Sequence, residues 1–271
     1  MPISKALTIA GSDSGGGAGI QADLKTFAAL GVYGCSVITA VTAQNTLQVS
    51  GIEAISPDMV RKQLEAALSD IHPNAIKTGM LANSAIIEAV AATLRRFPRV
   101  PLVLDPVMIA KSGDALLATE AVRTLCEQLI PLADMVTPNI PEAETLTGMR
   151  LAGDESIRKA AAAIRGMGAK AVLIKGGHLA IDRSEDSRAA EVADLYDDGK
   201  EVHRISGPWI DTPHTHGTGC TLASALAAGL ARGLSPYAAA RQAREFLTQA
   251  LRTAFPVGAG KSPVHHFHRW W

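Results

Sequence analysis

The sequence predicts a single α/β domain built on one mostly parallel β-sheet that is covered by helices on both faces. The main observation is that short apolar, β-branched runs alternate with stretches of helical length along most of the 271 residues. Such alternation is typical of right-handed βαβ units. The composition agrees, because hydrophobic residues make up 47% of the chain and charged residues 19%, which suits a well-buried core. We therefore expect one domain that spans residues 1–271.

The first predicted strand, Ala6–Ala10, leads directly into the glycine-rich segment Gly11–Gly19. A helical pattern follows at Ile20–Leu30, so the glycines occupy a strand-to-helix loop rather than a flexible tether. Glycines let the backbone of such a loop approach a ligand closely. The spacing fits neither the dinucleotide fingerprint nor the P-loop, since no Lys-Ser or Lys-Thr pair ends the segment.

The later segments continue the alternation. A second strand, Cys35–Thr42, ends in polar residues, and Ser56 is a suitable N-cap for a helix that begins at Pro57. Two short strands around Asp197-Asp198-Gly199 predict a hairpin, and two long helices close the chain. The remaining expected strands are 51–55, 75–78, 103–105, 135–137, 171–175, 192–196 and 201–205, and the expected helices are 57–70, 84–97, 119–130, 154–167, 218–232 and 235–254.

Charge and cysteine content exclude several classes of partner. Basic and acidic residues number 26 each, so no basic surplus attracts nucleic acid or anionic lipid. The N-terminus lacks the apolar stretch of a signal peptide, and no apolar run is long enough to span a bilayer. Cys35, Cys126 and Cys220 have no ligand-like spacing, which predicts free thiols in the cytoplasm.

One segment predicts an anion site. In His216-Gly217-Thr218-Gly219-Cys220, two glycines flank a hydroxyl residue at the start of a helix. Unpaired backbone N–H groups and the helix dipole favour a phosphate at such a position. By itself the segment fits equally well a glycine-containing turn with a cysteine that fills core space.

Three further polar features follow predicted strands, where open α/β sheets bind ligands. Asp105 could bind a metal ion or cap a loop, and Lys175 could contact phosphate or be an exposed lysine before a turn. Asn139 and Glu142 could offer oxygen ligands to Mg²⁺, or form an ordinary N-terminal helix cap. Four phosphate-compatible features at strand ends of one sheet favour a binding site over packing alone.

Several motifs also resemble a known family. They are residues 10–23, 39–46, 77–81, 104–108, 137–142, 175–178, 216–220 and 264–271. Over nearly its whole length the chain resembles the hydroxymethylpyrimidine/phosphomethylpyrimidine kinases of thiamine biosynthesis, within the ribokinase-like superfamily. The resemblance implies a ribokinase-like sheet with a small hairpin, a lid loop at Met108–Asp114 and a homodimer.

The resemblance also implies roles for individual residues. Mg²⁺ is expected at Glu142 and Asp105, directly or through water, and Asp23 either holds the substrate or braces the glycine-rich loop. The pyrimidine pocket is expected at Gln44, Gly11, Ala18, Asp23, Met80 and Val107, the ATP phosphates at Lys175, Asn139 and Thr218, and the transferring group at the amides of Gly217, Thr218 and Gly219 beside Cys220.

Cys220 stands where most ribokinase-like enzymes carry an aspartate base. We expect it to orient the substrate hydroxyl and accept its proton, with a thiol pKa that the helix lowers and a phosphate raises. The implied reaction is the Mg²⁺- and ATP-dependent phosphorylation of 4-amino-5-hydroxymethyl-2-methylpyrimidine, and then of its monophosphate. The alternatives are a pyridoxal kinase, in which a lid cysteine is expected where this chain has Ala110, and a non-catalytic pyrimidine or nucleotide binder.

Overall fold

The computed structural model describes residues 2–108, 119–176 and 191–271, and one nine-stranded sheet organises them. The strand order is β3-β2-β1-β4-β5-β6-β7-β8-β9. Strands β2, β1, β4, β5, β6 and β7 are parallel to one another, whereas β3, β8 and β9 join the two edges of the sheet through antiparallel pairs. The strands are β1 (Lys5–Asp13), β2 (Tyr33–Gln44), β3 (Val49–Ala54), β4 (Ala75–Thr78), β5 (Leu102–Leu104), β6 (Met135–Val136), β7 (Ala171–Ile174), β8 (Glu191–Asp197) and β9 (Val202–Pro208). The predicted mostly parallel sheet is confirmed.

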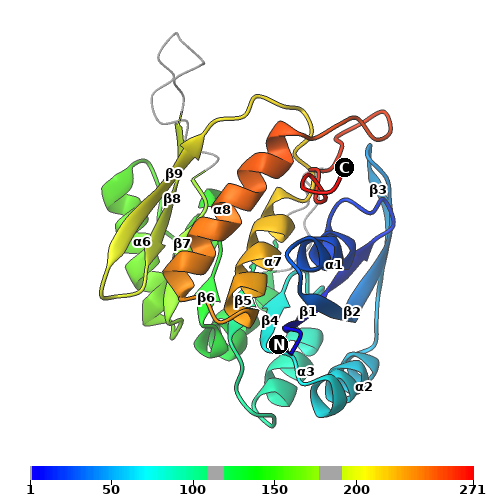
Figure 1. Cartoon of the computed structure of the whole chain (residues 1–271). Coiled ribbons are helices and arrows are strands. Elements are labelled where there is room, and N and C mark those ends of the chain that lie inside the picture. The colour runs from blue at the N-terminus through cyan, green and yellow to red at the C-terminus, as the bar shows by residue number, and fades with distance from the viewer. Residues whose placement is uncertain (1, 109–118, 177–190) are drawn as a thin grey trace.

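Helices cover both faces of the sheet. In Figure 1, α1, α7 and α8 lie side by side across one face, and the other helices lie on the opposite face. The first group is α1 (Gly19–Ala29), α7 (Thr218–Ala231) and α8 (Pro236–Arg252). The second is α2 (Pro57–Ala66), α3 (Ser84–Leu94), α4 (Thr119–Thr124), α5 (Ile140–Thr147) and α6 (Asp154–Gly166).

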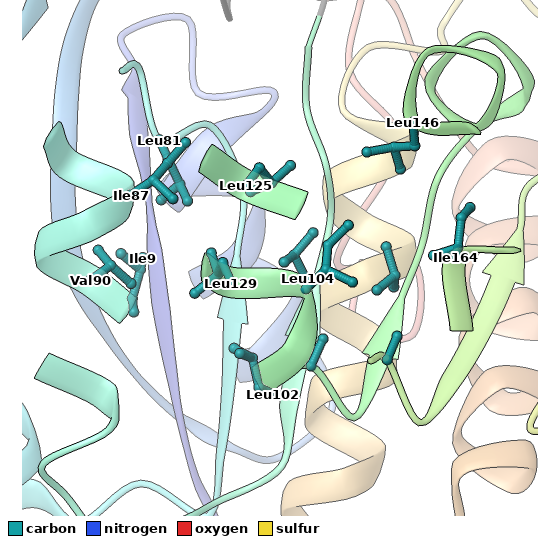
Figure 2. Close-up of a cluster of buried hydrophobic side chains, with 14 of the residues drawn as sticks. Ile9, Leu81, Ile87, Val90, Leu102, Leu104, Leu125, Leu129, Leu146 and Ile164 are labelled. Carbon is teal, nitrogen blue, oxygen red and sulfur yellow. The ribbon is translucent and has the colours of Figure 1, made fainter. Parts of the chain in front are cut away.

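Successive residues of the central strands pack into two separate hydrophobic cores. On β4, for example, Ala75 faces the α7 side and Ile76 faces the opposite side, and Ala171 and Val172 repeat this arrangement on β7. The small residues let the Ala-rich helix α7 lie close to the sheet. The larger residues fill the core that Figure 2 shows, between the sheet and the helices α3, α5 and α6. Burial on both faces explains why these strands read as continuous apolar runs.

The structure differs from the expected elements in three places. Strand β1 continues past Gly11 to Asp13, because β2 pairs with it as far as Thr42. The helices expected at 57–70 and 119–130 end in π-helical turns, at Ala67–Ile71 and Leu125–Leu129. Helix α5 is a two-turn helix that is not among the helices expected from the sequence. Most of the expected lid loop, Gly177, His178 and the expected exposed loop 181–190 lie outside the described residues.

Candidate active site

A cavity of about 690 Å³ lies at the carboxyl ends of the parallel strands. The glycine-rich loop, the ends of β2, β5 and β7, and the start of α7 all contribute to its wall. Of the predicted site residues, it is lined by Gly11, Ala18, Gln44, Met80, Asp105, Val107, Asn139, Glu142, Lys175, Gly217, Thr218, Gly219 and Cys220. The structure therefore brings together all of these residues, and only Asp23 lies apart.

The start of α7 forms the end of the cavity at which the sequence predicts phosphate, the predicted phosphate end. Gly217 is the N-cap residue and has φ of 76°, so the left-handed backbone there favours glycine. At Gly219, a Cβ atom would lie 3.5 Å from Lys175 Nζ and 3.7 Å from Asp105 Oδ2. The first amides of α7 therefore lie beside the half-buried cation of Lys175, and both attract negative charge.

Lys175 holds two carboxylates together at this end. Its Nζ lies 2.8 Å from Asp105 Oδ1 and 3.7 Å from Glu142 Oε2, and Thr137 also donates to Asp105 Oδ1 at 3.0 Å. Burial alone would lower the pKa of Lys175, but Asp105 and Glu142 raise it above its ordinary value. Lys175 is therefore a permanent cation at neutral pH.

Burial raises the pKa of Glu142 to about 7, and Asp105 adds to this rise, whereas Lys175 and the N–H of Asn139 act against it. The capping alternative at this position is confirmed. Asn139 Oδ1 accepts from Glu142 N at 2.8 Å, and Glu142 Oε2 accepts from Asn139 N at 2.7 Å. The cap engages the amide oxygen of Asn139 and orients the Glu142 carboxylate toward Lys175.

Asp105 and Glu142 fit Mg²⁺ only if water and nucleotide phosphates supply the remaining ligands. In the described parts of the chain, no group of three His, Cys, Asp or Glu side chains could hold a metal ion by itself. Asp105 and Glu142 line the cavity. Their contacts with Lys175, Thr137 and Asn139 use Asp105 Oδ1 and Glu142 Oε2, so the other carboxylate oxygen of each residue remains for a metal ion. Mg²⁺ is usually held by one or two carboxylates together with water and nucleotide phosphates, which matches this donor set.

Cys220 lies half-buried in the cavity wall beside the same charges. Burial raises the pKa of its thiol to about 11, with Asp23 and Asp105 adding to the rise and with Lys77 and the N–H of Gly19 opposing it. Of the two opposite shifts expected from the sequence, the rise is the one found, and its main cause is loss of hydration. The sulfur of the ligand-free protein is a neutral thiol at neutral pH.

Asp23 braces the site from behind and does not contact the cavity. Its carboxylate is fully buried and accepts from Lys77 Nζ at 2.8 and 3.0 Å, from Thr8 Oγ1 at 2.6 Å and from Ser224 Oγ at 2.5 Å. Both oxygens are satisfied, so the prediction that Asp23 contacts the substrate is corrected in favour of its bracing alternative. Lys77 does line the cavity, and sequence reasoning missed it. The available signal was a lysine inside a buried strand, which requires a partner.

The other end of the cavity, where the sequence predicts the pyrimidine ring, is narrow at Gly11, where a Cβ atom would lie 3.4 Å from Met80 Sδ. Gln44 is anchored through its backbone, because Ser14 Oγ accepts from Gln44 N at 2.8 Å and donates to Gln44 O at 2.7 Å. Sequence reasoning also missed Asp13 and His216, which line this end of the cavity and pair with each other at 2.8 Å. They stand 203 positions apart, so no local pattern could reveal the pair.

Comparisons with known proteins identify the family of this chain. A family model described as phosphomethylpyrimidine kinase matches residues 13–265. A hydroxymethylpyrimidine/phosphomethylpyrimidine kinase of Rhizobium meliloti is 52% identical over 269 residues, which are 98% of either chain.

Solved structures agree as well. The structure of the pyridoxal kinase from Staphylococcus aureus in complex with ADP has a TM-score of 0.89 at 37% identity, covering 100% of this chain and 96% of that one. A phosphomethylpyrimidine kinase from Clostridium difficile has a TM-score of 0.79 at 42% identity, covering 92% of this chain and 99% of the other. Among the described residues, no helix is both long and apolar enough to cross a membrane. The match to the family model and the high identity over the full length show that the chain belongs to the phosphomethylpyrimidine kinase family.

Proposed function

We propose that the protein uses Mg²⁺ and ATP to phosphorylate 4-amino-5-hydroxymethyl-2-methylpyrimidine and then its monophosphate, in thiamine biosynthesis. The observation that carries this proposal is that one cavity joins the Gln44 end to the phosphate end at Lys175 and α7. Membership of the phosphomethylpyrimidine kinase family gives the ring its chemical class.

Each end of the cavity has a separate task. The side-chain amide of Gln44 offers a donor and an acceptor together, which match the amino group and adjacent ring nitrogen of an aminopyrimidine. Lys175 and the first amides of α7 stabilise the charge of the phosphoryl group during transfer. When bound, Mg²⁺ at Asp105 and Glu142 supplies charge neutralisation for the nucleotide phosphates. Asn139 supports the binding of Mg²⁺, because the helix cap orients the carboxylate of Glu142.

A substrate panel tests the proposal. The protein is incubated with ATP and Mg²⁺ and with hydroxymethylpyrimidine, its monophosphate, pyridoxal or ribose, and ADP formation is measured with and without each acceptor. We expect acceptor-dependent turnover with both pyrimidines. Binding of pyrimidine without ATP consumption would instead indicate a non-catalytic binder.

Pyridoxal kinase is the second candidate, because solved structures with that name match the whole chain at 36–39% identity. The pyrimidine reading is favoured by the 52% identity of the relative named hydroxymethylpyrimidine/phosphomethylpyrimidine kinase. Ala110, where a cysteine is expected in dual-specificity enzymes, lies outside the described residues. In the panel, pyridoxal turnover above that of hydroxymethylpyrimidine would reverse this order.

Cys220 is proposed to orient the acceptor hydroxyl and to take its proton as transfer completes. With a pKa of about 11, only about one molecule in 10⁴ carries the thiolate at pH 7, so the wild-type kcat should rise with pH above neutrality. We expect C220A to lower kcat by about 10²-fold and to abolish this rise. A kcat for C220A within a few-fold of the wild type would rule out the role.

Glu142 should impose a separate pH dependence below neutrality. Its pKa of about 7 means that the carboxylate becomes protonated as the pH falls through 7 and can no longer hold Mg²⁺ with ATP. We expect kcat/KM for Mg·ATP to drop by about tenfold per pH unit below pH 7 and to level off above it. In E142Q the value should be low and nearly independent of pH over the same range. A full acidic limb that persists in E142Q would assign the titration to another group.

The homodimer and the cytoplasmic location are also proposals. The edge strand β3 exposes Ile52 and has no neighbouring strand on its outer side, so a second copy of the chain could pack there. Size-exclusion chromatography with light scattering would show the dimer, and I52K should weaken it. The three cysteines are free, as is usual in the reducing cytoplasm.

A further inference from the structure

Asp13 is the point at which the glycine-rich loop is tied together. Its Oδ1 accepts from Gly15 N at 2.8 Å, and its Oδ2 accepts from Gly17 N at 3.1 Å and Ala18 N at 2.8 Å. The same Oδ2 lies 2.8 Å from Nε2 of His216, which belongs to the other end of the chain. Burial would raise the pKa of Asp13, but His216 and the loop amides together lower it, so the carboxylate is ionised.

His216 is held by its own backbone next to the phosphate end. Its N–H donates to Ser262 O at 3.1 Å, and its carbonyl accepts from Val264 N at 3.4 Å. The two loops are in tight contact, since a Cβ on Gly17 would overlap the His216 ring and a Cβ on Gly217 would overlap the carbonyl of Gly17. Any movement of His216 would therefore shift both the glycine-rich loop and the start of α7.

The pair also borders the side-chain amide of Gln44. An ionised carboxylate only accepts, so Nε2 of His216 carries a proton and donates it to Asp13. Oε1 of Gln44 accepts from Thr42 Oγ1 at 3.3 Å, which leaves Nε2 of Gln44 3.3 Å from the same histidine nitrogen. His216 Nε2 offers this NH₂ group no acceptor, so the NH₂ hydrogens are left for a ligand.

We propose that His216 is a positioning residue that couples the two ends of the cavity: through Asp13 it holds the glycine-rich loop against the start of α7, and it leaves the NH₂ group of Gln44 available to the ring. This inference rests on the proposed function for the identity of the ring. His216 itself neither accepts the hydroxyl proton nor contacts the nucleotide in this role.

The variants H216Q and H216N test the proposal as a matched pair. The amide nitrogen of glutamine occupies the place of histidine Nε2 and can donate to Asp13, whereas that of asparagine occupies the place of Nδ1 and cannot. We expect H216N to lower kcat/KM for hydroxymethylpyrimidine by about 10- to 100-fold, since a misplacement of about 1 Å is enough for such a loss. KM for ATP should stay within about twofold, and H216Q should recover most of the activity.

Two further measurements separate positioning from a general structural defect. Calorimetric binding of the pyrimidine without ATP should weaken in H216N and be restored in H216Q. In a D13A background, H216N should cause little additional loss, because the acceptor for His216 is already removed. Equal losses in H216Q and H216N, additive losses with D13A, or a rise in KM for ATP matching that for the pyrimidine would each overturn the proposal. Failure of the proposed function itself would appear differently, as absent pyrimidine turnover in the wild type.

Discussion

Replacement of Lys175 by methionine is expected to lower kcat by about 10²–10³-fold, the loss that follows removal of one preorganised donor to developing charge. Lys175 Nζ is the cation that lies 2.8 Å from Asp105 Oδ1 at the start of α7, and its raised pKa keeps it charged throughout the neutral range. Gln44 is at the other end of the cavity, so the affinity for the pyrimidine should change little. Steady-state kinetics and calorimetric binding of the pyrimidine measure the two quantities separately.

K175M should also show a characteristic pH dependence of stability. Without the lysine, Asp105 and Glu142 face each other with no cation between them, which raises the pKa of Glu142 further above its unfolded value. A raised pKa means that the folded state binds the proton more tightly, so the free energy of unfolding falls as the pH rises through 7. Thermal melting at pH 6 and pH 8 should therefore differ more in K175M than in the wild type.

The control for this variant is K170M, which removes an exposed lysine just before the same strand, where it pairs with Asp134 at 2.7 Å. Both its kcat and its melting temperature should stay close to those of the wild type. If kcat of K175M remained within tenfold of the wild-type value, Lys175 would not be the principal phosphate contact.

Replacement of Gly217 by alanine is expected to remove nearly all activity. The added Cβ would overlap the backbone carbonyl of Gly17, and a backbone atom cannot turn aside as a flexible side chain can. The start of α7 must therefore move away from the glycine-rich loop by on the order of 1 Å, for which we expect at least about a 10²-fold loss of kcat/KM. Kinetics with both substrates should show the loss.

Gly233, at the other end of α7, is the matched control. It has φ of 84°, close to the 76° of Gly217, but a Cβ there would have no heavy atom within 4 Å. G217A and G233A thus share the cost of a left-handed alanine, about 1–2 kcal/mol, whereas only G217A adds the clash. Both should melt at a lower temperature, and only G217A should lose activity. Similar activity losses in the two variants would show that backbone strain, not the position of the loop, is responsible.

Much of the phosphate end could be predicted before the fold was known. Asp105 and Lys175 each follow an apolar run, and parallel strands deliver the residues at their carboxyl ends to one edge of the sheet. The Gly-Thr-Gly segment precedes an Ala-rich helix, which places its amides at that same edge. For these residues, position along the chain implies position in space, so local pattern was sufficient.

Asp23, Cys220 and His216 could not be interpreted in this way, because their roles depend on distant neighbours. The acidity of Cys220 depends on burial, which a helix start in the sequence does not reveal. Asp23 stands near the glycine-rich loop in sequence, yet its carboxylate is bound by Lys77, 54 positions away. Nothing in either segment indicates that partner.

The sequence by itself determined the alternation of strands and helices, the glycines at the two loops and the charged residues at strand ends, since each depends on short-range periodicity or backbone geometry. Only the tertiary structure decided which charges are satisfied. It pairs Asp23 with Lys77 and Asp13 with His216, and it places Cys220 close to Lys77, Asp23 and Asp105. The physical reason is that solvation and charge pairing depend on distance in space, and packing alone brings these side chains together.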